Sequence, residues 1–129
     1  MAGSIGDKYY DVFLKYRLWL CNQSDEGILG DGRFELLREI ERTGSLKSAA
    51  DNLNISYRKA WGNIKQAEEL LGFTLVIKQR GGKDGGSSQL STEGVQLLAA
   101  YDELREDFDQ SIKKITKKFF NKINKNGNK

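Results

Sequence analysis

Residues 44–72 restrict the fold of this 129-residue chain more than any other segment. They contain two stretches with helical spacing of apolar residues, and each stretch begins at a serine that can cap a helix N-terminus, Ser45 and Ser56. Only a tight turn at residues 52–55 separates the two stretches, and Gly72 ends the second one. This pattern predicts a short helix, a turn and a longer helix, which together form a helix-turn-helix unit.

The flanking sequence predicts further helices and strands. Asp31 is expected to cap the first helix and Thr92 the last one, with Glu93 in its first turn. A glycine-rich loop over residues 81–88 is expected to join two antiparallel strands. The predicted elements are strands at 10–21, 73–79 and 88–90, a helix at 31–42, and a long last helix beginning at 92.

The predicted fold class is mainly α with a small antiparallel β-sheet, arranged as a winged helix-turn-helix with a long C-terminal dimerisation helix. The expected organisation is a flexible N-terminus at 1–9, a winged helix-turn-helix domain at 10–91, a linker helix at 92–120 and a disordered basic tail at 121–129. The sequence contains no apolar run of 18 residues and no signal-peptide pattern, so a cytoplasmic location is expected.

The composition argues against an enzyme. The chain has no histidine, which excludes Ser-His-Asp triads, Cys-His pairs and His-Cys zinc sites, and no metal or cofactor is expected. Its single cysteine, Cys21, cannot form an intramolecular disulfide, which suits a reducing compartment. Cys21 lies in a predicted apolar strand, so we expect an inert buried thiol rather than a nucleophile.

The helix after Ser56 has two different faces. Ala60, Ile64, Ala67 and Leu71 lie within about 60° of one direction, and the polar positions lie more than about 90° away. One apolar face for support and one basic face suit a recognition helix in the DNA major groove. A charged face that simply contacts solvent is the alternative. Trp61 and Trp19 are expected to be packing residues.

Candidate DNA contacts come from three places. The start of the recognition helix is expected to meet the bases, and the hairpin loop and the short second helix to meet phosphates. For the hairpin loop the alternative is an ordinary mobile loop, and for the start of the short second helix it is a simple N-cap. A nucleotide-binding P-loop is not expected, because the hairpin loop lacks the Gly-Lys-Ser/Thr ending of that motif. The predicted contacts are Ser45, Lys47, Ser56, Tyr57, Arg58, Lys59, Gly62, Lys65, Lys78, Arg80 and Lys83.

The last helix carries an apolar stripe longer than a small domain needs for itself. Such a stripe predicts a homodimer, and folding back onto the chain's own N-terminal strand and first helix is the alternative. The predicted interface residues are Leu97, Tyr101, Leu104, Phe108, Ile112 and Ile115.

Several separated motifs resemble one family. Residues 44–56, Gly-Ser-Leu-Lys-Ser-Ala-Ala followed by Leu-Asn-Ile-Ser, resemble LysR-type and ModE-type winged helix-turn-helix proteins. Residues 56–61, Ser-Tyr-Arg-Lys-Ala-Trp, are similar to the ModE motif in particular. Residues 81–86 resemble that family's glycine-rich wing, and 90–94 resemble the opening of its linker helix.

This resemblance implies a bacterial, sequence-specific regulator of transcription that binds double-stranded DNA as a homodimer. The resemblance does not extend to the C-terminal molybdate-binding domains of the ModE family, so molybdate binding is not expected in this chain. A winged-helix module that docks an acidic protein partner is the alternative function.

Overall fold

A computed structural model describes residues 8–79 and 86–127, and the side chains of the last three of these are left aside. The chain divides into two compact units. One is Arg17–Tyr101, and the other comprises the described parts of Met1–Tyr16 and Asp102–Lys129. Each unit is considered separately below.

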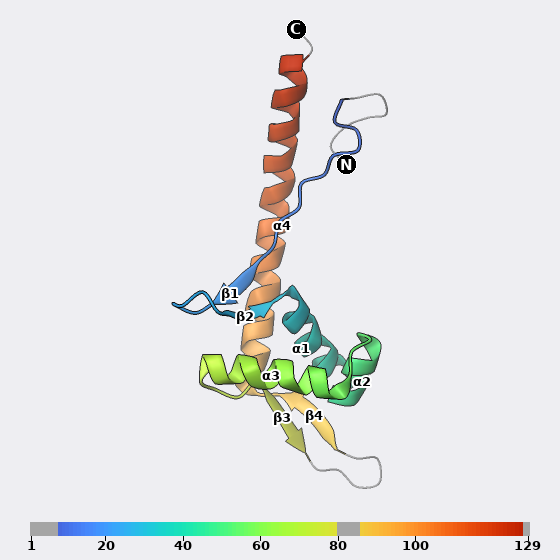
Figure 1. The fold of residues 1–129 in the computed structure, drawn as a ribbon, viewed down its shortest axis with the longest axis vertical. Coiled ribbons are helices and arrows are strands. Elements are labelled where there is room, and N and C mark those ends of the chain that lie inside the picture. The colour runs from blue at the N-terminus through green and yellow to red at the C-terminus, as the bar shows by residue number, and fades with distance from the viewer. Residues whose placement is uncertain (1–7, 80–85, 128–129) are drawn as a thin grey trace. The chain divides into compact units, whose positions relative to one another are not determined.

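The elements follow the predicted order, except that the structure contains one strand, β2, that the sequence analysis did not predict (Figure 1). Helices dominate, and the strands form two separate two-stranded antiparallel sheets, β1 with β2 and β3 with β4. The elements are β1 (Trp19–Cys21), β2 (Gly27–Gly30), α1 (Asp31–Thr43), α2 (Leu46–Asn52), α3 (Tyr57–Leu71), β3 (Val76–Gln79), β4 (Ser87–Leu90) and α4 (Thr92–Gly127).

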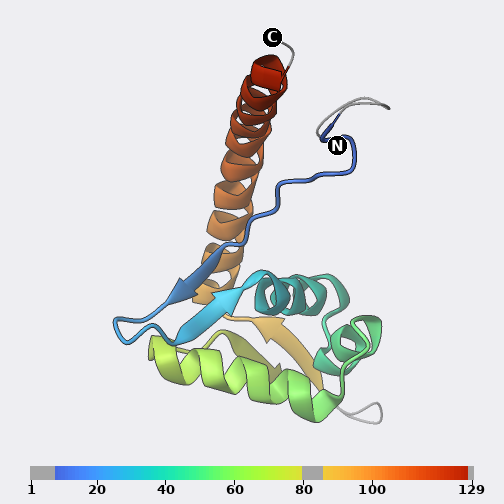
Figure 2. The same ribbon diagram turned by 45° about the horizontal axis from the view of Figure 1, so that its top comes forward.

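The core of the larger unit lies among α1, α2, α3 and the β3–β4 hairpin. Figure 2 shows α1 and α2 packed together, with α3 beside them. Each helix contributes apolar side chains at three- and four-residue spacing, the pattern expected of an amphipathic helix. The buried residues include Phe34, Leu37, Ile40, Leu46, Ala49, Ala60, Ile64, Ala67, Leu75, Leu90 and Leu98.

The predicted ends of the helix-turn-helix are confirmed. The Ser45 side chain accepts a hydrogen bond from the Ser48 amide, and the Ser56 side chain accepts one from the Lys59 amide, at 3.1 and 3.0 Å. Gly44 and Gly72 end α1 and α3 at φ of 71° and 85°, where a Cβ atom is disfavoured. Serines thus fix where α2 and α3 begin, and glycines fix where α1 and α3 end.

Two predicted caps were wrong. Asp31 lies in the first turn of α1, after an N-cap at Gly30 that has no side-chain cap. Ser91, not Thr92, caps α4: its hydroxyl accepts from the Gly94 amide at 3.0 Å and donates to the Thr74 carbonyl at 2.6 Å. Ser91 therefore joins the start of α4 to the chain entering β3.

The strands are shorter than predicted, and α4 is longer. Residues 10–18 belong to no strand, because β2 offers partners only to Trp19–Cys21. Trp19 is 60% exposed and Cys21 is exposed, so neither is the buried residue we expected. The helix predicted to end near residue 120 reaches Gly127, since the lysine- and asparagine-rich tail contains no proline to stop it.

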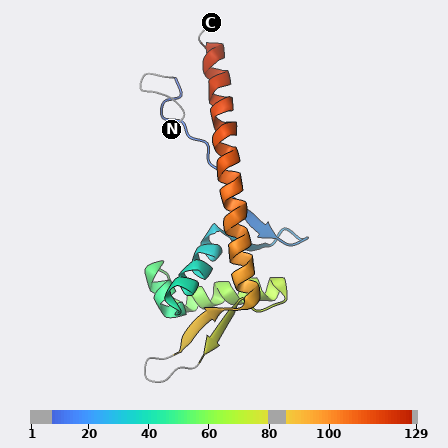
Figure 3. The same ribbon diagram turned by 180° about the vertical axis from the view of Figure 1, so that it is seen from behind.

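The smaller unit contains the C-terminal part of α4 and an extended segment that runs beside it (Figure 3). The Tyr16 hydroxyl donates to the Asp109 carboxylate, and the Arg105 guanidinium lies 5.2 Å from the centre of the Tyr16 ring. The Tyr9 and Phe120 rings are 6.2 Å apart. The hydrogen bond from Tyr16 lowers the pKa of Asp109 below its ordinary value.

The apolar stripe of α4 divides between the two units. Tyr101 stacks on Phe34 with the ring centres 3.7 Å apart, and its hydroxyl donates to Asp31, so this predicted interface residue is instead buried in its own unit. Leu97 is half-buried against the same core. In the smaller unit, by contrast, Leu104, Phe108, Ile115 and Phe119 are 40–55% exposed.

Gly94 gives a direct test of the packing at the start of α4. A Cβ atom at this position would lie 2.5 Å from the Leu75 carbonyl oxygen, whereas one at Gly32 would meet nothing within 4 Å. We expect Gly94→Ala to lower the free energy of unfolding by about 1–3 kcal/mol. Gly32→Ala, its control, should raise it by up to about 1 kcal/mol. Urea denaturation measures both, and equal effects would contradict the contact.

Candidate nucleic-acid interface

Helix α3 has the two faces that the sequence predicts. Ala60, Ile64 and Ala67 are fully buried or nearly so, and Leu71 is half-buried. The opposite face is solvent-accessible from the first turn onward, and Gly62 leaves open space where a side chain would stand. The exposed residues of this face are Tyr57, Arg58, Lys59, Gly62, Lys65 and Gln66.

The charges on α3 run against its dipole. The first turn holds Arg58 and Lys59 and no acid, although the N-terminus of a helix carries partial positive charge. The two glutamates of this helix, Glu68 and Glu69, lie toward its other end. In α1 the order is the favourable one, with Asp31 in the first turn and Arg42 in the last. Arg58 and Lys59 therefore do not stabilise their own helix through its dipole.

Arg58 and Lys59 are also available to a partner. Both side chains are exposed, and among the residues that the structure describes neither has an ion-pair partner. The Ser56 hydroxyl beside them accepts the capping hydrogen bond from Lys59, which leaves its own hydrogen free to donate. The start of α3 is thus an exposed group of unneutralised donors.

A cation–aromatic cluster joins α3 to the hairpin. Lys78 of β3 donates a hydrogen bond to the Tyr57 hydroxyl, and its ammonium lies 5.1 Å from the Tyr57 ring centre and 4.9 Å from that of Trp61. The Lys65 ammonium lies 4.6 Å from the same Trp61 ring. Half-buried Trp61 therefore contacts two lysines that the sequence predicts as DNA contacts.

Glu68 is a functional residue that the sequence analysis missed. Its side chain is buried on α3, and its carboxylate accepts from the Leu75 and Val76 amides at 2.7 and 3.1 Å. Its other oxygen lies 3.4 Å from the Lys65 ammonium. The sequence did contain a signal for the burial of Glu68. It stands four residues after Ile64, and this spacing places its side chain on the apolar face of the helix. Glu68 fixes where β3 begins relative to α3.

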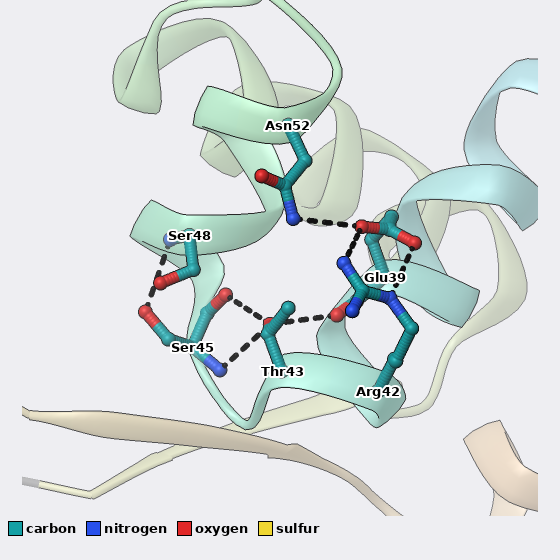
Figure 4. A network of polar contacts seen from close by, with 6 residues as sticks. All are labelled: Glu39, Arg42, Thr43, Ser45, Ser48 and Asn52. Atoms are coloured by element: carbon teal, nitrogen blue, oxygen red, sulfur yellow. Dashed lines mark hydrogen bonds and ion pairs between the residues drawn. The ribbon is translucent and has the colours of Figure 1, made fainter.

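A polar network holds the start of α2 against the end of α1 (Figure 4). Glu39 accepts two hydrogen bonds from Arg42, at 2.7 and 3.0 Å, and one from Asn52 at 2.9 Å. The Thr43 hydroxyl bonds the Glu39 carbonyl at 2.7 Å and the Ser45 backbone at 3.1–3.3 Å. These bonds position Ser45, which caps α2, and the exposed Lys47 beside it.

The structure brings the predicted contacts together only in part. Ser56, Tyr57, Lys65 and Lys78 lie in one continuous group on α3 and β3. Arg80 and Lys83 lie outside the described residues. Within the described part of the chain, no group of three or more acidic or cysteine side chains can hold a metal, and no helix is long and apolar enough to cross a membrane.

Known proteins match this region. Residues 32–95 match the family model described as bacterial regulatory helix-turn-helix protein, lysR family. At the level of fold, the chain is similar to ArgP from Mycobacterium tuberculosis (TM-score 0.50, 19% identity, 64% of this chain and 29% of that one). It is also similar to the BenM DNA-binding domain in a complex with benA site 1 DNA (TM-score 0.50, 24% identity, 68% and 92%).

Curated relatives narrow the comparison. The molybdenum transport protein ModE of Azotobacter vinelandii is 33% identical over 90 residues, which are 70% of this chain and 33% of that protein. The DNA-binding transcriptional dual regulator ModE of Escherichia coli K12 is 36% identical over 74 residues, 57% of this chain and 28% of that protein. The chain thus spans about a third of the length of these relatives.

The fold and the match together define the class of protein: the chain carries a LysR-type winged helix-turn-helix domain. Within that class the domain is ModE-like, as the motifs at residues 44–61 indicate. The predicted family and fold class are therefore confirmed. The matching family model describes regulatory proteins, and the E. coli relative is named as a regulator of transcription.

The network around Glu39 predicts a pH dependence of stability. The hydrogen bond from Arg42 and then that from Asn52 lower the pKa of Glu39 from 4.5 to about 2. A lowered pKa in the folded state gives stability that is present above the unfolded value and lost as the pH falls toward the folded one. We therefore expect the stabilisation to be full above about pH 5 and to disappear toward pH 2.

Thermal unfolding of Glu39→Gln between pH 2 and 7 measures this contribution. The wild type should unfold at a higher temperature above about pH 5, and the two melting temperatures should converge below it. Exposed Glu41, on the same helix and without an ion-pair partner among the described residues, provides the control variant Glu41→Gln. A gap in melting temperature that does not change with pH would refute the role of the Glu39 carboxylate.

Proposed function

We propose that this chain regulates transcription by binding double-stranded DNA sequence-specifically through α3 and the β3–β4 hairpin. The observation that carries the proposal is the exposure of Arg58 and Lys59 at the N-terminus of α3, where neither has an ion-pair partner among the described residues. Cations at a helix N-terminus oppose the dipole, so folding alone does not account for them. The phosphate backbone of DNA supplies the negative charge that they lack.

The groups divide into base readers and phosphate contacts. Arg58, near the N-terminus of α3, can donate two parallel hydrogen bonds to guanine in the major groove, and Gly62 allows close approach of the helix. Phosphates suit the remaining donors of α2 and α3, and Arg80 and Lys83 outside the described residues, because phosphate contacts position a protein without reading sequence. These donors are Ser45, Lys47, Ser56, Lys59, Lys65, Arg80 and Lys83.

DNA binding is preferred over docking to an acidic protein because of the arrangement of the donors. Within the described residues they lie on α3, at the start of α2 and, for Lys78, on the adjoining strand β3. A winged helix presents its recognition helix to a groove and its hairpin to the flanking backbone. The E. coli relative is named as a DNA-binding regulator, and the BenM domain was solved on DNA. Both facts support the same partner.

Alanine substitution at Arg58 and Lys59 tests the interface. On a site selected from a random DNA library, Arg58→Ala should cost about 1–3 kcal/mol and relax the preference at one base position. Lys59→Ala should weaken binding to all sequences and lower the salt slope, −dlogK/dlog[salt], by about 0.9. Fluorescence anisotropy at several salt concentrations measures both effects.

Lys15→Ala is the matched control, because Lys15 is an exposed cation in the other unit, outside the interface. It should leave affinity and sequence preference unchanged. If DNA binding survives Arg58→Ala with Lys59→Ala while the protein stays folded, α3 is not the recognition helix.

We further propose that the chain forms a symmetric homodimer through the smaller unit. Leu104, Phe108, Ile115 and Phe119 are exposed there, and Ile112 lies near the middle of their stripe. The stripe has nearly the same spacing read from either end, so two antiparallel copies place Leu104 opposite Phe119 and Phe108 opposite Ile115. Such a dimer carries two copies of α3, one for each half of a palindromic site.

Charge favours the antiparallel arrangement. Residues 102–109 contain five acids and one arginine, whereas residues 110–124 contain five lysines and no acid. Antiparallel copies bring the acidic segment of each onto the lysine-rich segment of the other, and parallel copies would oppose like charges.

Charge reversal tests both the dimer and its direction. Glu106→Lys with Asp107→Lys should weaken self-association on the order of tenfold, and adding Lys117→Glu with Lys118→Glu should restore it. Sedimentation equilibrium measures the dissociation constants. A wild-type chain that stays monomeric at tens of micromolar would overturn the dimer. Reversals without effect would overturn its antiparallel direction.

A further inference from the structure

Lys78 makes both a cation–π contact and a hydrogen bond with Tyr57. Tyr57, Trp61 and Lys65 stand four residues apart along α3, so they form one row on the side of the helix that faces β3. Lys78 reaches this row from β3, where its ammonium lies 5.1 Å from the Tyr57 ring centre and 4.9 Å from that of Trp61. It also donates a hydrogen bond to the Tyr57 hydroxyl.

The chemistry of the two groups fixes the direction of that hydrogen bond. An ammonium carries three donors and no acceptor, so the phenolic oxygen of Tyr57 must accept. No acceptor for the hydroxyl hydrogen of Tyr57 is found among the described residues, so this hydrogen can donate to another group. The Tyr57 side chain is 42% exposed, so a ligand can reach this hydrogen.

We infer that Lys78 is a positioning residue that makes Tyr57 a dedicated hydrogen-bond donor to DNA. Tyr57 in this state selects acceptors: a phosphate oxygen, or O6 and N7 of guanine, N7 of adenine and O4 of thymine in the major groove. Lys78, which the sequence suggested as a phosphate contact, acts instead mainly through Tyr57. This inference rests on the proposed function and adds a specific role for two of its residues.

Trp61 and Lys65 complete the arrangement and provide its control. Trp61 contacts both ammonium groups, with that of Lys65 at 4.6 Å and that of Lys78 at 4.9 Å from its ring centre. Lys65, however, pairs with Glu68 at 3.4 Å and has no contact with the Tyr57 hydroxyl in the described part of the chain. The two lysines thus share an aromatic neighbour and differ in the one contact that matters here.

A double-mutant cycle on DNA binding tests the inference. Tyr57→Phe and Lys78→Met should each lower affinity about tenfold for the site selected by the wild type, and the double variant should lose little more than either alone. Lys65→Met should lower affinity independently, so its effect should multiply with that of Tyr57→Phe. Methionine keeps the length and the apolar stem of lysine, so the packing against Trp61 is retained.

The salt dependence separates a positioning role from a direct phosphate contact. If Lys78 acts through Tyr57, Lys78→Met should change the salt slope by much less than the value of about 0.9 expected for one lost phosphate contact. Far-ultraviolet circular dichroism and thermal unfolding confirm that each variant is folded.

The outcomes distinguish this inference from the proposed function. The positioning role would be overturned if the affinity losses of Tyr57→Phe and Lys78→Met simply multiply and Lys78→Met lowers the salt slope by about 0.9. That result would leave DNA binding through α3 intact. A wild-type chain that selects no DNA site, or binding unaffected by Arg58→Ala with Lys59→Ala, would overturn both. Coupling confined to the Tyr57–Lys78 pair would establish the role.

Discussion

The close packing of α3 against the rest of its unit determines the geometry of the interface. Its buried face uses alanine at positions 60 and 67, where both side chains are fully inaccessible, with Ile64 between them. Small side chains bring the helix backbone near the core, and a larger residue would require the neighbouring helices to move. Since the buried face fixes the rotation of α3, it also fixes which residues point outward. The exposure of Arg58, Lys59 and Gly62 follows from the burial of the two alanines.

Hydrogen bonds from α3 then place the hairpin. The buried Glu68 carboxylate accepts hydrogen bonds from two backbone amides at the start of β3. Further along the strand, Lys78 contacts Tyr57 and Trp61. The first contact satisfies amides that would otherwise be buried without partners. The second lies on the exposed side, where it orders groups that can meet a ligand. Helix and hairpin are therefore joined at two points, one buried and one exposed at the proposed DNA interface.

Local chemistry explains which features were predictable from the sequence. Ser45, Ser56, Gly44 and Gly72 were assigned correctly, because caps depend on a few neighbouring residues. The two faces of α3 were assigned correctly because helical periodicity is also local. The strand at 10–21 was overextended, because strand length depends on a distant partner, and β2 pairs with only three residues.

Long-range contacts account for the other differences. Tyr101 matched the apolar stripe of α4 as well as its neighbours did, but its stacking on Phe34 depends on how α1 packs. The role of Glu68 was missed because its partners are backbone amides seven and eight residues away. The orientation of α3 charges against the helix dipole, by contrast, needs only the sequence and the helix bounds. A feature that weakens its own helix and remains exposed is more informative about function than one that stabilises the fold, because burial and dipole energetics leave it unexplained.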